Sequence, residues 1–559
     1  MNLLIKFFTV LFLLLAPQGF TQIKVWKQST QTTNFTTQQW EVNDVVFTAK
    51  HVVDKPFLKD IFALVTHKKK TKKIPLFYNG AKQWVFRYSS SDVGQQHYQI
   101  LGDLEGVSGH KGTIDVVKNT KTNRHGGIVT NPKDPRHFYY QDGSAYFNLA
   151  FECDWLFALD YAQKELKKTN HLLDLIAKNG FNQVVMNVYA YGLDLDWVTD
   201  ERLQENPQHN YGAREDIFPF KGSNLKPDYS TLNVEFFKHF DRVISAMHDR
   251  ELVSHLMIYV WNKRVAWPKA GSEADKMYYE HVIKRYQAFP NIIWDVSKEA
   301  ANKIAREQNI NIIAHLEACI KKTRELDSYQ RLLSVHDFGF CKNHQEEVDF
   351  ISIQNWRFQI HDDMQKAYKA FPNKPIFNIE HGGYEASPYE VFPGGYSNAE
   401  ACLRRNYLCL FGGTYTTYYW QGTAWTAIIH NPFEQDDSFV KPHFDYFKYL
   451  SDFFKTYKFE NFEPVMGYNT RSYNLTNYKE GQVLLYVPKE VHHADVKRQL
   501  DKEFDYSQAT WQWFNTQTGV YTSEKPVIFE HKYGFWDWRP YRNQADAILI
   551  VKGLKSKKK

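Results

Sequence analysis

The segment Asn291–Ala300, NIIWDVSKEA, decides how the rest of the chain is interpreted. Its first residues form a short apolar run of the kind that fills a buried strand, and the run ends on the adjacent pair Lys298 and Glu299. One interpretation is a strand that leaves the core into a solvated loop. The other is an active site at the carboxyl end of a barrel strand. The remainder of the chain distinguishes between the two.

Seven further apolar runs of similar length accompany this segment, and amphipathic stretches alternate with them. The eight runs are FNLAFECD (147–154), QVVMNVYA (183–190), HLMIYVW (255–261), NIIWDVS (291–297), RLLSVHD (331–337), VDFISIQ (348–354), PIFNIE (375–380) and TYTTYYW (414–420). Eight strand–helix alternations predict a (β/α)8 TIM barrel, to which we assign residues 121–454. A doubly wound sheet is the rival fold, but its Gly-rich phosphate turn is missing from the sequence.

The residues on both sides of the barrel follow a different pattern. Short alternating strands with turn residues between them predict an immunoglobulin-like β-sandwich over residues 22–120. The segment Asn123–Pro135, rich in Gly, Pro and Asn, is interpreted as a linker. Strands return near Lys455, so residues 455–559 are predicted to form a C-terminal β-sandwich without helices. The predicted fold class is therefore multidomain, α/β plus all-β, with a central barrel flanked by two β-sandwich domains.

The first residues of the chain resemble an export signal. MNLLIKFFTVLFLLLAPQGFTQ combines a lysine-bearing start with an apolar run from Phe7 to Ala16. That run is shorter than the roughly 20 residues that a membrane-spanning helix needs. Residues 1–21 are therefore predicted to be a secretory signal peptide, cleaved near Thr21. No cysteine precedes Cys153, which argues against a lipid anchor. We expect a secreted or periplasmic protein without a membrane partner.

Composition and charge narrow the classes of function. Five cysteines are sparse and odd in number, which excludes a disulfide framework, and no zinc-finger spacing occurs, so we expect no metal and no cofactor. The net charge of +6 comes without a nucleic-acid-binding signature, so no nucleic-acid partner is expected. The 16% aromatic content is typical both of sugar-binding proteins and of β-sandwich cores. The oligomeric state is left open.

The predicted barrel strands end on polar and aromatic residues. In a (β/α)8 barrel, the carboxyl ends of the strands line the active site. Any one of these residues is explained equally well as a cap or a solvated loop group, but the set as a whole predicts a functional site. In chain order the strand ends are Glu152 and Asp154, Asn187, Trp261–Asn262, Glu299, His336–Asp337, Gln354–Trp356, Glu380–His381 and Trp420.

Two glutamates stand out among these strand ends. Glu299 follows the fourth strand and Glu380 ends the seventh, and these two strands face each other across a barrel mouth. Retaining glycosidases use two carboxyl groups about 5–5.5 Å apart, one as nucleophile and one as acid and then base. We therefore predict that Glu299 and Glu380 are the catalytic pair. An inverting enzyme, with carboxyl groups about 6.5–9.5 Å apart, would instead pair Glu152 or Asp337 with one of the glutamates.

Further strand-end and loop residues are predicted to bind the sugar. Aromatic rings stack on the apolar faces of pyranoses, whereas amides, imidazoles and carboxylates hold hydroxyl groups. Trp294 lies inside a strand pattern and is the most typical of a core residue. The candidate platforms are Trp155, Trp261, Trp294, Trp356, Trp420 and Trp425. The candidate polar ligands of the sugar are Glu152, Asn187, Asn262, His336, Gln354 and His381.

Several motifs of the chain resemble the apiosidase-like group within the retaining barrel clan of glycoside hydrolases. The motifs are Glu152-Cys153-Asp154-Trp155, similar to Asp-Thr-x-Trp after the first strand; Gly180-Phe181-Asn182 before the second; Trp294–Glu299, similar to W-x-x-x-N-E; and PIFNIEHGGYE (375–385), similar to the nucleophile strand. FYNGAKQWVFRYSSSDVGQQHYQI (77–100) resembles the N-terminal sandwich of the group, whose function is unassigned, and WFNTQTGVY (513–521) resembles its tail domain. The resemblance spans almost the whole mature chain and implies a secreted retaining glycosidase acting on a polysaccharide or its oligosaccharides. It also implies that Glu380 is the nucleophile and Glu299 the acid/base.

One position departs from the pattern of the group. Where the clan usually carries an asparagine that contacts the sugar 2-hydroxyl, this chain has Lys298. A lysine ammonium donates three hydrogen bonds and accepts none. Lys298 would contact a sulfate or carboxylate of an anionic glycan, such as those of algae, or lower the pKa of Glu299, or else turn to solvent. The alternative function is a non-catalytic carbohydrate-binding protein on a degenerate barrel.

Overall fold

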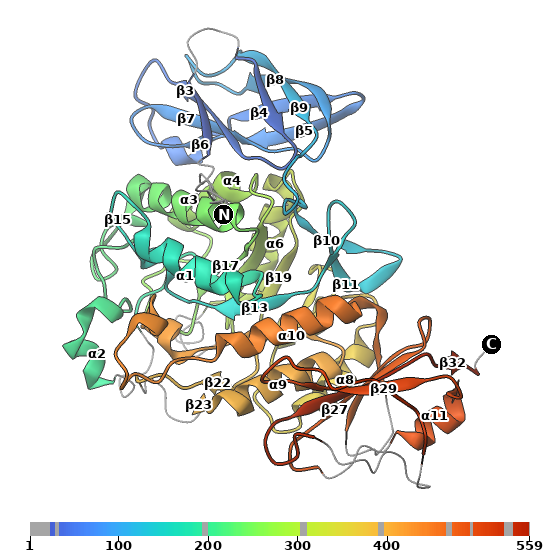
Figure 1. The fold of residues 1–559 in the computed structure, drawn as a ribbon. Helices are drawn as coiled ribbons and strands as arrows, with labels where there is room; N and C mark the ends of the chain where they lie inside the picture. The colour runs from blue at the N-terminus through green and yellow to red at the C-terminus, as the bar shows by residue number, and fades with distance from the viewer. Residues whose placement is uncertain are drawn as a thin grey trace, which may run out of the picture.

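The structure is a computed structural model with three parts, shown in Figure 1: an N-terminal β-domain, a central barrel and a C-terminal β-domain. The predicted signal peptide, residues 1–21, lies outside the described residues. Within the described ranges, no helix is long and apolar enough to cross a membrane. The structure describes residues 23–27, 33–192, 200–301, 310–389, 396–465, 472–491, 496–529 and 540–557.

Eight parallel strands form the central barrel. They are β13 (Leu149–Glu152), β14 (Gln183–Asn187), β17 (Val253–Val260), β18 (Ile292–Lys298), β19 (Leu333–His336), β20 (Ile351–Gln354), β21 (Ile376–Glu380) and β24 (Tyr415–Tyr418). Their order in the sheet is β19-β18-β17-β14-β13-β24-β21-β20, and the two end strands, β19 and β20, lie against each other. The predicted barrel is confirmed, with β18 as the fourth strand and β21 as the seventh.

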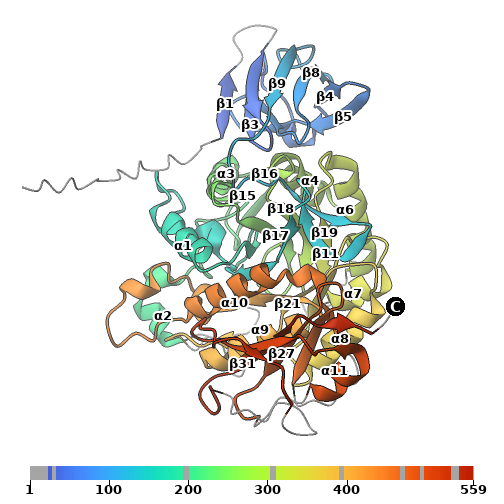
Figure 2. The same ribbon diagram turned by 45° about the vertical axis from the view of Figure 1, so that its right-hand side comes forward.

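Helices cover the outside of this barrel, as Figure 2 shows. They are α1 (Lys167–Lys178), α3 (Val234–Asp249), α4 (Glu273–Tyr286), α6 (Ile312–Leu326), α7 (Phe338–Asn343), α8 (Ile360–Ala370), α9 (Ala399–Phe411) and α10 (Phe444–Tyr457). Apolar residues at helical spacing fix their orientation, since Phe236, Phe240, Val243 and Met247 of α3 are all fully buried. An insertion after β14 adds α2 (Glu201–Glu205), β15 (Phe220–Gly222) and β16 (Pro227–Leu232).

The N-terminal domain is a sandwich of two sheets. One sheet has the order β1-β3-β7-β6 and the other β2-β9-β8-β4-β5. Alternate residues along β8 and β9 point into a shared core, which gives the period of two expected for strands with one buried face. The strands are β1 (Lys24–Lys27), β2 (Phe35–Gln38), β3 (Asn43–Thr48), β4 (Phe62–His67), β5 (Lys70–Pro75), β6 (Phe77–Tyr78), β7 (Gln83–Tyr88), β8 (Gly94–Leu101) and β9 (Lys111–Val117).

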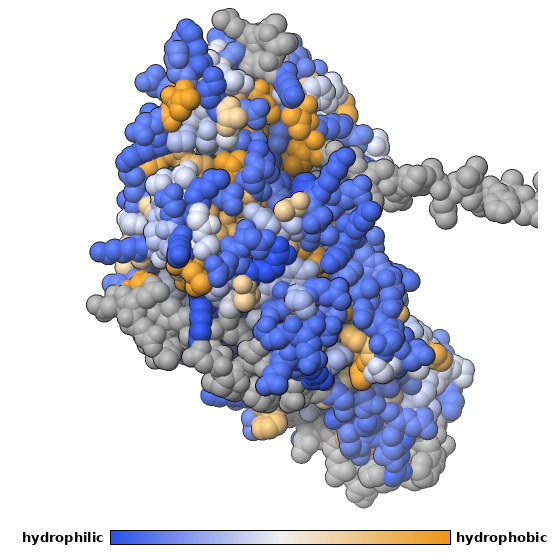
Figure 3. Space-filling model, turned by 90° about the vertical axis from the view of Figure 1, so that its left-hand side faces the viewer, coloured by the Kyte–Doolittle hydropathy of each residue, from blue (hydrophilic) through white to orange (hydrophobic). Residues whose placement is uncertain are grey.

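A buried charge cluster joins the sandwich to the barrel. Arg87 of β7 donates hydrogen bonds to both carboxylate oxygens of Asp44 and to both of Asp241 on α3, at 2.7–3.0 Å. Arg285 of α4 adds two further bonds to Asp241 at 2.7 and 2.8 Å. Figure 3, which shows the side that faces left in Figure 1, has hydrophobic side chains gathered around the sandwich and this junction. Phe57 and Phe77 of the sandwich also pack edge-on against His281 of α4, with ring centroids 5.1 and 6.1 Å apart, so ring packing and paired charges both hold the sandwich on the barrel.

The segment interpreted as a linker has regular structure instead. Residues within Asn123–Pro135 form β10 (Ile128–Asn131) and the start of β11 (Asp134–Tyr140), an antiparallel pair that continues into β12 (Ala145–Tyr146). The Asn-Pro-Lys turn that suggested a linker is the turn of this hairpin. Phe138 on β11 packs against Phe350 and Tyr415, with ring centroids 5.5 and 5.1 Å apart, so the hairpin is part of the barrel core.

The C-terminal domain is built on a six-stranded sheet of order β25-β26-β27-β31-β29-β30. One face packs on the barrel helices, where Tyr486 stacks on Tyr407 of α9 at 5.0 Å and Phe514 lies 4.6 Å from Phe453 of α10. The strands are β25 (Glu463–Pro464), β26 (Tyr473–Asn477), β27 (Gln482–Val487), β29 (Thr510–Asn515), β30 (Lys525–Pro526) and β31 (Ala547–Lys552).

Two expectations about this domain are wrong. We expected no helix there, but α11 (Lys497–Glu503) is present and buries Leu500 against the other face of the sheet, beside the two-stranded pair of β28 (Phe504–Asp505) and β32 (Lys555–Ser556). The last barrel helix, α10, also runs to Tyr457, past the boundary placed at residue 454. Its apolar face continues past that point because it packs on the barrel and on the sheet at once.

Candidate active site

The two predicted catalytic glutamates meet at the mouth of the barrel. Glu299 directly follows β18, and Glu380 is the last residue of β21. Gln354, at the end of β20, pairs in register with Glu380 and donates a hydrogen bond to Oε1 of Glu299 at 3.3 Å. The backbone carbonyl of His336, at the end of β19, accepts the backbone N–H of Glu299 at 3.0 Å. The ring of the same residue places Nε2 3.6 Å from Oε2 of Glu380. The ends of strands five and six therefore bridge those of strands four and seven.

Glu299 is the half-buried member of this pair. Asn262 donates to its Oε1 at 3.1 Å, and Gln354 donates to the same oxygen. Its backbone φ is 48°, in the left-handed region that costs a non-glycine residue about 1–3 kcal/mol. The pairing of β18 with β19 also shifts register between Asp295 and Lys298. Strain of this kind persists where surrounding contacts hold a side chain in place, and Asn262 and Gln354 supply such contacts.

Glu380 is 2% exposed and is held by protein groups. The hydroxyl of Tyr384, which begins the short strand β22 (Tyr384–Glu385), donates to Oε1 at 2.7 Å. Burial raises the pKa of Glu380 to about 7, and the charge of Glu299 adds to this, while Lys298 and the Tyr384 hydroxyl oppose it. The arrangement gives one shielded carboxyl with a nearby cation and one accessible carboxyl, so the two groups differ in their environment.

Lys298 donates hydrogen bonds to two carboxyl groups of the protein. Its Nζ donates to Glu152, the last residue of β13, at 2.8 Å and to Asp154 at 3.1 Å. The residue is 3% exposed, so the alternative that it turns to solvent is wrong. Its expected contact with a substrate anion finds no support either, because Lys298 already donates to two carboxyl groups of the protein, of which Asp154 carries a negative charge. Of the two proposed catalytic glutamates, Glu380 is the one whose pKa Lys298 lowers.

A second buried lysine extends this charge cluster. Lys263 is 1% exposed, with Nζ 3.6 Å from Asp154 and 4.7 Å from the ring centroid of Trp425. Burial raises the pKa of Asp154, but Lys298 and Lys263 outweigh it and hold that pKa below its usual range. Burial likewise lowers the pKa of Lys298, yet Asp154 and Glu152 hold it well above its usual range. The Lys298–Asp154 pair is therefore ionised.

His336 is neutral in this setting. It is 1% exposed, and burial together with the charge of Lys298 holds its pKa well below the usual value. A neutral imidazole next to Glu380 contributes one donor and one acceptor without adding a further charge.

The predicted tryptophans divide into two groups. Trp155, Trp261 and Trp420 are 0–1% exposed, which contradicts their predicted role as platforms because stacking on a sugar needs an open ring face. They pack in the core instead, as Trp420 does against Phe444 at 5.7 Å. Trp294 is also fully buried and donates to Asp327 at 2.9 Å, which confirms that it is a core residue.

The other two predicted platforms remain at the mouth of the barrel. Trp356 and Trp425 are half-buried, and both lie edge-on to Tyr384, with ring centroids 5.4 and 5.9 Å from it. Since Tyr384 bonds Glu380, these two rings stand next to the predicted nucleophile.

The remaining predicted residues form the wall of the site. Asn187, at the end of β14, is fully buried and donates to Asp154 at 3.3 Å. His381 is also fully buried, and its Nδ1 accepts the backbone N–H of Gly383 at 3.2 Å. Buried polar atoms without a hydrogen-bond partner among the described residues include Glu152 Oε2, Asn187 Oδ1 and Lys263 Nζ. Such atoms are costly unless something binds them, so they mark the floor of a polar binding site.

Sequence reasoning missed two residues of the site. Tyr384 lies four residues beyond Glu380, within the quoted strand-seven motif, and Lys263 directly follows Asn262. Both could have been found by extending the search from strand ends into the loops that follow them.

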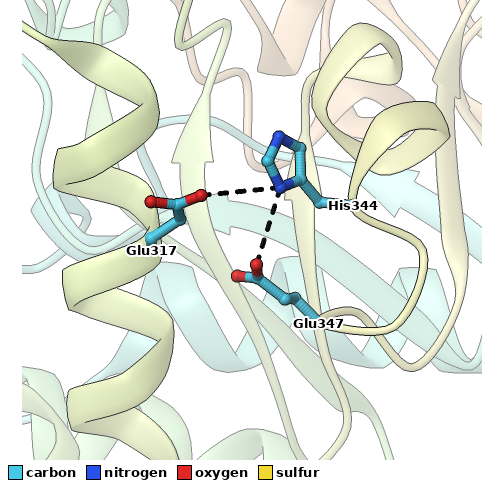
Figure 4. Close-up of side chains that lie close together, drawn as sticks. All are labelled: Glu317, His344 and Glu347. Carbon is cyan, nitrogen blue, oxygen red and sulfur yellow. Dashed lines mark ion pairs between the residues drawn. The ribbon is translucent and has the colours of Figure 1, made fainter.

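A separate group of possible metal ligands lies on the outside of the barrel, between α6 and the loop after α7 (Figure 4). Nδ1 of His344 is 3.6 Å from Glu317 and 3.5 Å from Glu347. The ring of His344 also stacks on Phe340 at 4.4 Å. Glu317 is exposed and the other two side chains are half-buried, which is the usual setting of a surface ion-pair cluster.

Comparisons with known proteins agree with this geometry. The sequence pattern of the apiosidase-like catalytic domain matches residues 132–461. No curated protein sequence matches the chain. A crystal structure of a candidate glycoside hydrolase from Bacteroides vulgatus ATCC 8482 has a TM-score of 0.68 at 18% identity, with 93% of this chain and 100% of the other covered.

A second structure from Bacteroides vulgatus ATCC 8482, a glycoside hydrolase family 5 protein, has a TM-score of 0.52 at 18% identity and covers 77% of this chain and 93% of its own. These likenesses establish the fold. Because the matched catalytic domain spans more than half of the chain and contains both glutamates, the protein belongs to the apiosidase-like family and has the (β/α)8-barrel fold of a glycoside hydrolase.

Proposed function

We propose that the protein is a retaining glycoside hydrolase that cleaves a polysaccharide or its oligosaccharides, with Glu380 as nucleophile and Glu299 as acid/base. The observation that carries the proposal is the meeting of these two residues, from strands four and seven, through His336 and Gln354. Consistent with its predicted signal peptide, we propose that it acts outside the cytoplasm.

The environments of the two carboxyl groups support this division of roles. Burial raises the pKa of Glu380 to about 7, while Lys298 and the Tyr384 hydroxyl oppose this shift and favour the ionised form that a nucleophile needs. Glu299 is half-buried, so a leaving group and later a water molecule can reach it.

The reaction then follows from the two positions. Glu380 attacks the anomeric carbon while Glu299 gives its proton to the leaving glycosidic oxygen, and the bond between that carbon and oxygen breaks. Glu299, now ionised, takes a proton from water, whose oxygen attacks the anomeric carbon and releases Glu380. The floor formed by Glu152, Asn187 and Lys263 is suited to the hydroxyl groups of the sugar held there.

The inverting alternative is disfavoured by the contacts of its candidate carboxylates. Glu152 binds Lys298, and Asp337 accepts the backbone N–H groups of Phe340 at 2.9 Å and Ala301 at 3.2 Å. Asp337 is therefore the N-cap of α7. The binding-only alternative is disfavoured because a carbohydrate-binding protein has no need of two glutamates, from strands four and seven, held together at one end of the barrel.

The test begins with a screen of plant and algal polysaccharides, neutral and sulfated, followed by proton NMR of the first product. Retention of the anomeric configuration supports the mechanism, and inversion refutes it. Glu380→Gln should abolish turnover. Glu299→Ala should slow natural substrates severely but spare aryl glycosides whose leaving groups need no proton. Turnover by Glu380→Gln at the wild-type rate would remove that residue from the mechanism.

The matched control is Glu251→Gln. Glu251 is a buried glutamate whose pKa burial also raises to about 7, but it lies before β17, at the opposite end of the barrel. Its replacement should leave turnover unchanged, which separates loss of the nucleophile from loss of a buried charge.

A further inference from the structure

A groove opens beside the catalytic pair on the outer side of the barrel. It has a volume of about 430 Å³, within the range of small-ligand sites, and is lined by residues of α7, α8 and the end of β20. The two helices are labelled in Figure 2. Gln354 and Trp356 line its inner end, and Lys342, Arg357 and Lys366 line its sides.

The inner wall of the groove is also the wall of the active site. Gln354 donates to Glu299, and Trp356 packs edge-on against Tyr384, which bonds Glu380. The groove therefore begins on the side of Glu299, the group proposed to protonate the leaving oxygen. A sugar released from that oxygen would extend into it.

The loop from Asn355 to Gln359 borders the groove and carries two aromatic rings. Trp356 lines the groove and is half-buried, whereas Phe358, two residues on and next to the lining residue Arg357, is 95% exposed. Flat rings are the usual partners of sugar faces, so the open ring of Phe358 is available to a sugar that extends past the groove. Asn355 is fixed at the base of the loop by hydrogen bonds to the backbone of Glu380 and to Asp363.

The charge of the groove is positive. Its lining contains Lys342, Arg357 and Lys366 against the single carboxylate of Asp363, which already accepts from Asn355 and pairs with Lys366 at 3.3 Å. Arg357 acts on Asp363, whose pKa its charge helps to lower together with Lys366, so three cations share one carboxylate in this groove. An arginine and a lysine on opposite sides of a groove suit an anionic ligand with oxygen acceptors.

We propose that this groove binds the leaving-group part of the glycan, and that this part carries an anionic group, carboxylate or sulfate, between Arg357 and Lys342. The inference rests on the proposed function, because that function identifies the bond cleaved next to the groove as a glycosidic bond. Under this proposal, the negative charge of the substrate is bound by Lys342 and Arg357 at the rim of the site. Lys298 is not involved, because carboxyl groups of the protein already bind it. The face of Phe358 would hold a sugar ring further along the same chain.

The experiment measures binding in the catalytically inactive Glu380→Gln protein by calorimetry, so that it does not depend on turnover. The probes are oligogalacturonate as carboxylate ligand, a carrageenan oligosaccharide as sulfate ligand, and a neutral galactan oligosaccharide of equal length. We expect one of the anionic probes to bind, and the double variant Lys342→Gln/Arg357→Gln to lose about tenfold or more of that affinity. The loss should shrink at high salt, because the two cations are exposed.

Controls separate the groove from a general charge effect. Lys369→Gln removes an exposed lysine of α8 that does not line the groove, and it should leave affinity unchanged. Phe358→Ala should weaken binding of every probe that binds, since it removes a ring and no charge. The carboxylate and sulfate arms identify which anion is recognised.

The inference is overturned if the neutral and anionic probes bind alike, if the double variant keeps wild-type affinity, or if Phe358→Ala has no effect. None of these outcomes touches the proposed function, which fails separately if the otherwise wild-type protein has no glycosidase activity or if Glu380→Gln remains active.

Discussion

Replacement of Lys298 by methionine tests the internal charge cluster. The ammonium lies 2.8 Å from Glu152 and 3.1 Å from Asp154. At an effective dielectric constant of about 20, the separation from the ionised Asp154 gives an attraction of about 5 kcal/mol, part of which burial of the charges offsets. Removing one partner of a buried ion pair typically costs about 3–5 kcal/mol, and we expect a loss in the free energy of unfolding of that size for Lys298→Met.

The same variant should change the pH dependence of activity. Glu380 must be ionised to act, and its pKa of about 7 means that kcat/KM of the wild type should fall as the pH decreases through about 7. Lys298 lowers that pKa. Its loss should therefore raise the pKa of Glu380 and move the acidic limb of the profile to higher pH, by about 1–3 units for a neighbouring charge.

The assays are urea unfolding followed by tryptophan fluorescence and kcat/KM measured on one substrate across pH. Lys284→Met is the matched control, since Lys284 is 6% exposed and pairs with Glu280 at 3.0 Å on α4, away from the site. It should not move the pH profile. The reasoning is refuted if Lys298→Met unfolds at the wild-type urea concentration, or if its acidic limb stays in place.

Two further replacements test contacts elsewhere. Tyr384→Phe removes the hydroxyl that bonds Glu380, so kcat/KM should fall about tenfold to a hundredfold and the acidic limb should move to higher pH. Arg87→Met leaves Asp44 without its bidentate partner and takes one of two arginines from Asp241, so the free energy of unfolding should fall by about 3–5 kcal/mol. Burial opposes ionisation of Asp241, yet Arg285 and Arg87 hold its pKa at about 2; this stabilisation is present above about pH 4 and is lost as the pH falls toward 2.

Controls for both replacements come from neighbouring groups. Tyr419→Phe removes a hydroxyl that bonds the backbone of Ile379 at 2.6 Å and no carboxylate, so it should not shift the pH profile. Lys50→Met breaks an exposed pair with Glu105 on the sandwich and should leave unfolding unchanged. Equal effects of Tyr384→Phe and Tyr419→Phe, or unaltered stability of Arg87→Met, would contradict the roles given to these contacts.

The barrel could be predicted because its signals are local. Each strand is a short apolar run, and each ends where the polarity changes, as Ile292–Lys298 and Ile376–Glu380 do. Since all eight strands are parallel, their carboxyl ends meet on one rim, and the order of strands along the chain places Glu299 and Glu380 opposite each other. No contact between distant side chains had to be known for that conclusion.

Local signals were misleading where a turn or helix boundary depends on packing. The Gly- and Pro-rich residues of Asn123–Pro135 carry turn signals, but these signals do not say whether a turn joins two strands or leads into a linker. Here Phe138 has a place in the barrel core beside Tyr415, and this packing makes the segment a hairpin. The helix α11 is likewise explained by the sheet face that it covers.

The sequence by itself determined the barrel, the flanking β-domains and the positions of the two glutamates, because strand periodicity and strand ends are properties of adjacent residues. The tertiary structure decided what surrounds those glutamates. Lys298 is neutralised by Glu152 and Asp154 of β13 and its following turn, about 145 residues earlier, and no local pattern encodes that pairing. Whether a tryptophan faces the core or the mouth also depends on what packs against it, since burial is a property of the assembled barrel and not of the strand that carries the residue.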